Sequence, residues 1–409
     1  MEQTKFKVYG YRWVVLLAFM SVVTINQLLW ITFAPITGAA ASFYGVSDLS
    51  IGLLSMSFMI VYIIISIPAS WVIDTYGIRV AVGIGAALTG VFGMLRGFVA
   101  PSYTWVLVSQ IGIAIGQPFI LNAVTKVAAR WFPIRERATA SGLGSLAIYL
   151  GIFLGLVLTP FLTIRSGISG MLVSYGIVSM IMAIIFFAVA RERPPTPPCS
   201  PDQDERSLVF DGLKRTLRQR DFLLLMVVFF VGLGVFNGVT TWIENIVRPR
   251  GFSITQAGII GGLMVMGGII GALIIPALSD RYSKRTPFIM LALAGATLGL
   301  VGLTYATSYW LLLTSAFVLG FFLLSSGPIG FQYGAEIAYP APEGTSNGLL
   351  LQIGQISGVV FIFAMDSFKS PESGSMISSM VVLIGLMVVS LLVSTRLRES
   401  AMMAEITGH

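Results

Sequence analysis

A small set of amide, indole and phenol side chains interrupts the long apolar runs of this sequence. The set comprises Asn26, Trp30, Gln117, Asn122, Tyr149, Asn237, Trp242 and Gln355. Burying such a group away from water costs free energy unless it finds a hydrogen-bond partner, so each must either join two helices or contact a solute. An aromatic face can hold an organic cation through cation–π attraction, and an amide can hydrogen-bond a neutral polar solute. These residue types therefore indicate non-covalent binding of a small solute.

The residues that most catalytic and metal sites need are scarce. The chain has one cysteine, Cys199, and one histidine, His409. This excludes a disulfide framework and a cysteine-based metal site, and it argues against a Ser–His triad or a histidine-bound metal. We therefore expect no enzyme activity, no cofactor and no metal.

The charged residues of the apolar runs lie near their ends, and we find none at the middle of a run. Proton-coupled symporters usually keep a buried titrating group there, and anion carriers usually place a central Arg or Lys there. Downhill facilitated transport is therefore the simplest mechanism. Glu244 and Glu336 are the candidates for proton coupling, if there is any.

Composition places the chain in a membrane. It is 56% hydrophobic and 11% charged, with a mean hydropathy of +0.89, whereas soluble proteins carry about 25% charged residues. A spanning helix needs roughly 20 apolar residues, and twelve runs qualify: 13–38, 51–73, 80–99, 104–129, 139–163, 170–190, 222–247, 256–279, 287–306, 309–337, 344–365 and 374–395. The first run is long enough to span, so we expect a membrane helix there and not a cleaved signal peptide.

The positive charge follows a topology pattern. The net charge is +7, but with twelve spans most Lys and Arg fall on one side, and the other side carries Arg96, Arg165, Arg248, Arg250 and Lys369. The positive-inside rule then predicts that both termini are cytoplasmic. We expect an integral plasma-membrane (or prokaryotic inner-membrane) protein, monomeric, whose partners are the lipid bilayer and a small-molecule substrate, with no nucleic acid.

Three segments are expected along the chain. Residues 1–190 form a first six-helix bundle, 191–221 a proline-rich cytoplasmic linker with a short amphipathic helix, and 222–409 a second six-helix bundle. The two bundles share a repeat, because Asp74 and Asp280 lie 206 positions apart, as do Arg79 and Arg285. Such internal symmetry is typical of duplicated transporter folds.

The repeated loops "PASWVIDTYGIR" (68–79) and "PALSDRYSKR" (276–285) resemble the signature loop of the major facilitator superfamily. This resemblance implies an all-α fold of two pseudo-symmetric bundles that works by alternating access, with spans 1, 4, 7 and 10 lining a central cavity. It also implies that the charged loop residues form a cytoplasmic latch and do not contact substrate. These residues are Asp74, Arg79, Asp280, Arg281 and Arg285.

Further stretches are similar to the feline leukaemia virus subgroup C receptor-related family. They include "GQPFILNAVTKVAARWF" (116–132) and "PIGFQYGAEIAYPAPEGTSNGLL" (328–350). That family is described as carrying choline and ethanolamine, with an older assignment to haem export. Its choline site implies binding roles for Trp30, Gln117 and Gln355, whereas the expected tyrosine of span 7 is replaced by Asn237. Two alternatives follow: the nearby Trp242 substitutes for that aromatic residue, or the substrate differs.

Three functional hypotheses stay open at this point. The first is a facilitator of organic cations or amino alcohols such as choline or ethanolamine. The second is a proton-coupled transporter of another solute, such as a carboxylate, nucleoside, drug or haem. The third is a membrane receptor or scaffold, against which the paired Asp–Arg loops argue because a static scaffold needs no latch.

Overall fold

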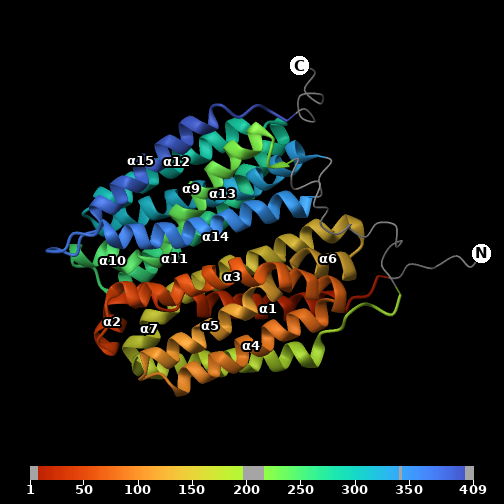
Figure 1. Cartoon of the computed structure of the whole chain (residues 1–409), viewed down its shortest axis with the longest axis horizontal. Helices are drawn as coiled ribbons and strands as arrows, with labels where there is room; N and C mark the ends of the chain where they lie inside the picture. The colour runs from red at the N-terminus through yellow and green to blue at the C-terminus, as the bar shows by residue number, and fades with distance from the viewer. Residues whose placement is uncertain (1–7, 197–215, 340–342, 401–409) are drawn as a thin grey trace, which may run out of the picture. The chain divides into compact units, whose positions relative to one another are not determined.

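The structure is a computed structural model that describes residues 8–196, 216–339 and 343–400. Regular structure in these ranges is helical (Figure 1). The elements are α1 (Arg12–Ile31), η1 (Ala34–Ile36), α2 (Thr37–Tyr44), α3 (Asp48–Tyr76), α4 (Ile78–Phe98), α5 (Tyr103–Leu121), α6 (Val124–Trp131), α7 (Ile134–Val189), α9 (Arg220–Thr241), α10 (Ile243–Val247), η3 (Arg248–Arg250), α11 (Ile254–Tyr282), α12 (Thr286–Tyr305), α13 (Tyr309–Ala338), α14 (Glu343–Ser367) and α15 (Ile377–Ser394).

The expected spans are present. Eleven stretches of the described chain are long and apolar enough to cross a membrane. The longest helix, α7, has 56 residues, and Gly167 inside it has a φ of 69°. Because a left-handed residue interrupts an α-helix, α7 is two helices, which match the expected spans 139–163 and 170–190. The predicted all-helical membrane fold is confirmed.

Three of the expected continuous spans are broken in the structure. The run 13–38 divides into α1, η1 and α2, the run 104–129 into α5 and α6, and the run 222–247 into α9 and α10. At the first break, an α-helix would need the backbone N–H of residue 35 to bond to the carbonyl oxygen of Ile31. Residue 35 is a proline and has no N–H, so the helix cannot continue regularly there. The length of an apolar run does not reveal such breaks, because each run continues across its break.

The chain folds into two compact units. The first comprises Met1–Phe33 and Ala39–Glu205, and the second comprises Ala34–Gly38 and Arg206–His409. The short segment Ala34–Gly38, which includes η1, packs with α10 and α11 of the second unit. The expected linker 191–221 and its amphipathic helix fall mainly on residues 197–215, which lie outside the described ranges.

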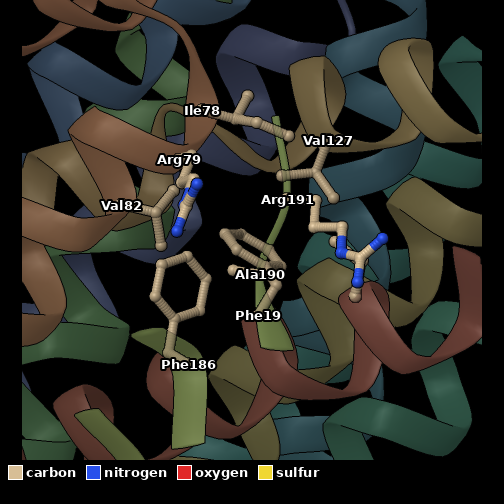
Figure 2. Close-up of a pocket in the computed structure, with 9 residues that line it drawn as sticks. Phe19, Ile78, Arg79, Val82, Val127, Phe186, Ala190 and Arg191 are labelled. Carbon is tan, nitrogen blue, oxygen red and sulfur yellow. The ribbon is translucent and has the colours of Figure 1, made fainter. Parts of the chain in front are cut away.

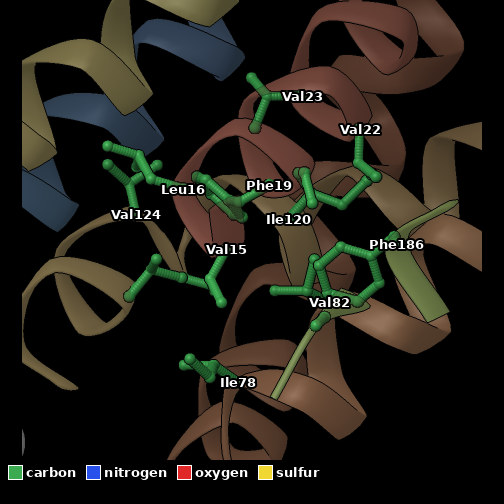
Figure 3. Packing of buried hydrophobic residues seen from close by; sticks show 14 of the residues in the cluster. Val15, Leu16, Phe19, Val22, Val23, Ile78, Val82, Ile120, Val124 and Phe186 are labelled. Atoms are coloured by element: carbon green, nitrogen blue, oxygen red, sulfur yellow. The ribbon is translucent and has the colours of Figure 1, made fainter. Parts of the chain in front are cut away.

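The core of the first unit forms where α1, α4, α5 and α7 meet (Figure 3). Val15, Phe19, Val82, Ile120 and Phe186 are each no more than 3% exposed. Lipid tails are as apolar as these side chains, so in a bilayer close packing, and not removal from water, holds such helices together. Tight interdigitation of these residues therefore fixes the positions of the helices that carry the polar groups.

In the second unit α11 and α13 approach each other through glycines. A Cβ on Gly320 of α13 would collide with the carbonyl oxygen of Met264 on α11. A Cβ on Gly271 of α11 would likewise collide with the carbonyl oxygen of Phe321 on α13. Small residues at such points let helix backbones come closer than side chains would permit.

Gly320→Ala is expected to lower the melting temperature of the detergent-solubilised protein. The added methyl group meets a backbone atom that cannot move aside, and overpacking of this kind costs about 1–3 kcal/mol. Gly327→Ala is the matched control on the same helix, because its Cβ would have no neighbour within 4 Å. That control should be neutral or slightly stabilising, since alanine favours helix over glycine. Equal melting temperatures for the two variants would contradict the close approach of α11 and α13.

Candidate functional site

Trp30 lies in the last turn of α1 and is 6% exposed. Its indole N–H donates a hydrogen bond to the carbonyl oxygen of Ser55 on α3, at 3.2 Å. This bond joins α1 to α3 and fixes the plane of the ring. A fixed ring with its polar N–H already satisfied leaves only its aromatic face for a ligand, which suits a cationic or apolar group.

Two further polar side chains of the first unit make no hydrogen bond to any described residue. Gln117 on α5 is 5% exposed, and Tyr149 on α7 is half-buried. Most buried polar groups in proteins are hydrogen-bonded, and the buried amides of Asn26 and Gln110 in the same unit are. The amide of Gln117 and the hydroxyl of Tyr149 therefore retain hydrogen-bonding capacity for water or a solute.

The two asparagines expected to bind substrate are engaged within the first unit. The Asn26 amide donates to Thr89 Oγ1 on α4 at 3.1 Å. Asn122 accepts a hydrogen bond from the Tyr62 hydroxyl at 2.6 Å and donates to the hydroxyl oxygens of Ser66 and Ser70 on α3. Both side chains thus join helices, and Asn122 does so at the break between α5 and α6. Neither retains the free hydrogen-bonding capacity that Gln117 has.

In the second unit the structure brings Asn237 next to the chain at Gln355. The Asn237 amide on α9 donates to the carbonyl oxygen of Gly354 on α14, at a long 3.5 Å. Gln355 itself is half-buried and makes no hydrogen bond to a described residue. The Asn237 amide is thus only weakly hydrogen-bonded, and the Gln355 amide is available to bond a solute.

Trp242, the aromatic residue expected near the missing tyrosine, is buried in this structure. Its side chain is 0% exposed, and its indole N–H donates to the carbonyl oxygen of Ile362 at 3.0 Å. A ring packed on all sides presents no face to a solute. In this structure Trp242 packs α9 against α14, and its contribution to the binding site stays a prediction.

In the first Asp–Arg loop, Asp74 forms an ion pair with a residue of another helix. Asp74 bonds to Lys126 of α6, with 2.6 Å between Oδ1 and Nζ. The Arg79 side chain is exposed and makes no ion pair with a described residue. Both partners of the observed pair are partly exposed, and such pairs contribute little to stability. The two residues lie 52 positions apart in the chain, so no local pattern predicts that they pair.

The second loop forms a buried ionic cluster. Arg285 is bound to Asp280 and, at 3.0 Å, to Glu336 of α13. The Glu336 carboxylate also accepts hydrogen bonds from the Gln332 amide and the Ser400 hydroxyl. Burial lowers the pKa of Arg285, but the hydrogen bonds to Asp280 and Glu336 raise it to a net value above the ordinary one. The guanidinium of Arg285 therefore stays charged, and the buried carboxylate of Glu336 serves as its counter-ion.

Two glutamates that sequence reasoning did not single out cap the helices after these loops. Glu192 accepts hydrogen bonds from the backbone N–H groups of Ile78 and Arg79, at 3.2 and 2.8 Å. Glu399 accepts from those of Arg285 and Thr286, at 2.8 and 3.3 Å. A carboxylate at a helix N-terminus satisfies orphan donors and complements the helix dipole. Each glutamate follows the last span of its half, which is the signal that could have revealed the pair.

A small cavity lies in the first unit near Arg79. It is partly open to solvent, and its walls are mainly apolar side chains of α1, α4 and α7. In Figure 2 Arg79 and Arg191 flank Phe19, and the Arg191 guanidinium stacks on the Tyr11 ring at 5.0 Å. None of the expected substrate-binding residues lines this cavity, so it is separate from the candidate site.

Glu244, a candidate for proton coupling, is buried in the second unit. Its side chain is 4% exposed and lies 3.4 Å from Arg248 Nη1. The same carboxylate accepts a hydrogen bond from the backbone N–H of Gly38, at 3.1 Å. It thus holds the segment that includes η1 on α10.

Arg96 departs most from expectation. Its position near the end of an apolar run placed it among the charges of the outer loops, but in α4 it is 0% exposed. A buried charge inside a membrane bundle is costly and must be paired or hydrogen-bonded. Arg96 meets this requirement through hydrogen bonds to Leu29, Thr32 and Gln110.

Comparison with known proteins decides the family. A sequence profile described as "Major Facilitator Superfamily" matches residues 15–362. The chain belongs to the major facilitator superfamily. It is therefore a multi-pass membrane transporter, as its helical architecture and repeated loops indicated.

Curated relatives show which members of the superfamily this chain resembles. "Solute carrier family 49 member A3" of Xenopus tropicalis is 31% identical over 392 residues, covering 91% of this chain and 81% of that protein. "Choline/ethanolamine transporter flvcr2b" of Danio rerio is 28% identical over 419 residues, covering 97% of this chain and 86% of the relative. The predicted resemblance to the feline leukaemia virus receptor-related family is confirmed.

Solved structures show the same fold. A bacterial homologue of the human lysosomal transporter Spinster, in an inward-facing and unoccupied conformation, superimposes with a TM-score of 0.74 at 17% identity. The match covers 95% of this chain and 98% of that protein. At this identity the likeness supports the fold alone, and the major facilitator architecture expected from the sequence is confirmed.

Proposed function

We propose that this transporter moves a small organic cation or amino alcohol, such as choline or ethanolamine, downhill by alternating access. Relatives at 28% identity are named as choline/ethanolamine transporters. A quaternary ammonium group is recognised in proteins by aromatic faces through cation–π attraction. Trp30, with its N–H bonded to Ser55 and its orientation fixed, offers such a face.

The observation that carries the proposal is the contrast between engaged and available polar groups. Asn26, Asn122 and Trp242 are hydrogen-bonded within their own units. Gln117 and Gln355 make no hydrogen bond to a described residue, although buried amides normally do. We therefore propose Trp30, Gln117 and Tyr149 from the first unit, and Gln355 and Asn237 from the second, as the substrate-binding residues.

The test is uptake of radiolabelled choline and ethanolamine into proteoliposomes without a pH gradient. Facilitated transport predicts saturable uptake that stops when inside and outside concentrations are equal. A thermal-shift screen in detergent against choline, ethanolamine, betaine, carboxylates, nucleosides and haem identifies the substrate class independently, because a ligand of the folded state raises the melting temperature. Stabilisation by carboxylates or nucleosides alone would reject the amino-alcohol proposal.

A second candidate, proton-coupled transport of another solute, is favoured by one observation, the nearly complete burial of Glu244. Protonating this carboxylate would weaken its bonds to Gly38 and Arg248. Facilitated transport predicts that Glu244→Gln leaves uptake independent of an imposed inward proton gradient, as in wild type. A wild-type rate that rises several-fold with the gradient, and a Glu244→Gln rate that does not, would establish the second candidate. Glu336→Gln is measured alongside as the other coupling candidate.

Several finer points belong to the same proposal. We propose a plasma-membrane or prokaryotic inner-membrane location with both termini cytoplasmic, and a monomer. The Asp74 and Asp280 loops, with Arg79, Arg281 and Arg285, are proposed to act as a latch in the transport cycle. The division into bundles 1–190 and 222–409 with a linker at 191–221 is likewise retained as a proposal. The receptor or scaffold alternative is disfavoured because the chain belongs to a superfamily of transporters.

A further inference from the structure

Arg96 is held by oxygen atoms of neutral groups. Its Nη1 donates to the carbonyl oxygen of Leu29 at 3.1 Å and to Gln110 Oε1 at 2.7 Å, and its Nη2 donates to Thr32 Oγ1 at 3.4 Å. Within the described chain no carboxylate bonds to it, and its Nε has no hydrogen-bond partner. This is an unusual place for a charge, because a buried arginine in a bundle normally pairs with an acid or marks a functional element.

The groups that Arg96 contacts belong to the broken end of α1. This helix ends at Ile31, and the last carbonyl groups of a helix lack intrahelical partners. The Leu29 carbonyl oxygen accepts hydrogen bonds from Arg96, from the Gln110 amide at 3.2 Å and from the Thr32 hydroxyl at 3.2 Å. Three donors thus converge on one carbonyl that the break leaves open. Without them this buried end would be unsatisfied.

The aromatic residues at the break are fixed by the same contacts. Trp30 lies between Leu29 and Thr32 in the chain, so Arg96 anchors the chain on both sides of it. The guanidinium also lies 5.7 Å from the centre of the Phe33 ring, immediately beyond the break. Trp30 itself is tied to α3 through Ser55. The chain around the ring and the ring itself are therefore held by separate helices, α4 and α3.

We propose that Arg96 is a positioning residue for Trp30. Through two nitrogens it clamps the chain on either side of this tryptophan and so sets the depth and angle at which the indole face meets the substrate. The planar guanidinium supplies several donors in a fixed geometry, whereas lysine supplies a single point charge on a flexible stem. The substrate part of this inference rests on the proposed function. The clamp on Trp30 itself does not.

The test compares two variants of the buried arginine, Arg96→Lys and Arg96→Gln, with the control variant Arg165→Lys. Arg165 is an exposed arginine of the same unit. The substrate-free readout is acrylamide quenching of the Trp30 emission, taken as the difference between each protein and its Trp30→Phe counterpart. Arg96→Lys is expected to make Trp30 about twofold or more easier to quench, because charge is kept but the two-sided clamp is lost. Arg165→Lys should leave the quenching unchanged.

The transport measurement determines KM and the maximal rate separately for each variant. A displaced indole should raise the KM for choline about tenfold for Arg96→Lys, with the maximal rate within about twofold of wild type, because a tenfold change needs only a modest loss of binding. Unchanged quenching and unchanged KM in Arg96→Lys would overturn the inference. If wild type carries no amino alcohol, the proposed function fails, and the quenching result still decides the role of Arg96.

A second variant keeps the inference testable if Arg96 variants do not fold. Gln110→Leu removes one donor to Leu29 and one of the three acceptors of Arg96, and it leaves the charge of Arg96 in place. It should increase quenching of Trp30 in the same direction but by less. An unaltered Trp30 signal in a folded Gln110→Leu protein would count against the clamp.

Discussion

Trp30→Ala is expected to abolish measurable choline uptake at micromolar substrate and to raise the KM about thirtyfold. Cation–π attraction in a desolvated site contributes about 2 kcal/mol, and each 1.4 kcal/mol corresponds to a factor of ten. Because the Trp30 N–H bonds to Ser55 and not to a solute, only the ring face is lost to the substrate. Radiolabelled uptake into proteoliposomes at several choline concentrations measures the effect.

Trp105→Ala is the matched control for this prediction. Trp105 lies on α5 in the same unit, but its side chain is 57% exposed. Removing it should alter neither KM nor maximal rate. Trp30→Phe should restore part of the affinity, since phenylalanine keeps an aromatic face of weaker attraction. Wild-type uptake kinetics in Trp30→Ala would disprove the aromatic recognition of the substrate.

Arg285→Gln is expected to have the largest effect on stability. It leaves the Glu336 carboxylate, 5% exposed, without its counter-charge, and breaking a buried ion pair by removing one partner costs about 3–5 kcal/mol. The loss should lower the melting temperature of the detergent-solubilised protein by roughly 10 °C. The contribution of Asp280 to this loss is small, because its side chain is 66% exposed and solvent screens exposed pairs.

Two comparisons isolate the buried pair in this experiment. Arg281→Gln removes an exposed arginine from the same loop and should change the melting temperature little. The double variant Arg285→Gln/Glu336→Gln removes both charges and should recover part of the loss, since no buried charge is then unpaired. A melting temperature of Arg285→Gln equal to that of Arg281→Gln would show that the Arg285–Glu336 pair does not stabilise the second unit.

The spans and their duplication could be predicted because they depend on local composition. A run of about 20 apolar residues can meet its backbone hydrogen bonds only as a helix in lipid, whatever its neighbours are. The duplication could be recognised from the spacing of the loops around Asp74 and Asp280 alone. The same logic separated the runs 139–163 and 170–190, and Gly167, which interrupts α7, lies between them.

The site residues were harder to predict from the sequence than the spans, because the type of a polar residue does not reveal its hydrogen-bond partner. Asn26 and Gln117 are both buried amides in apolar runs, yet the first bonds to Thr89 and the second to no described residue. Trp30 and Trp242 both satisfy their indole N–H with a backbone carbonyl, but only Trp30 retains any exposure. These differences depend on which helices face one another.

The sequence by itself determined that this protein is a twelve-span helical membrane protein with a duplicated plan, because the length of apolar runs and the spacing of repeats can be read along the chain. Only the tertiary structure decided where the spans break, that Glu192 and Glu399 cap the helices after the two loops, and that Arg96 is buried against the end of α1. Each of these joins residues distant along the chain, and the free energy of such a contact depends on burial and geometry that no local pattern encodes.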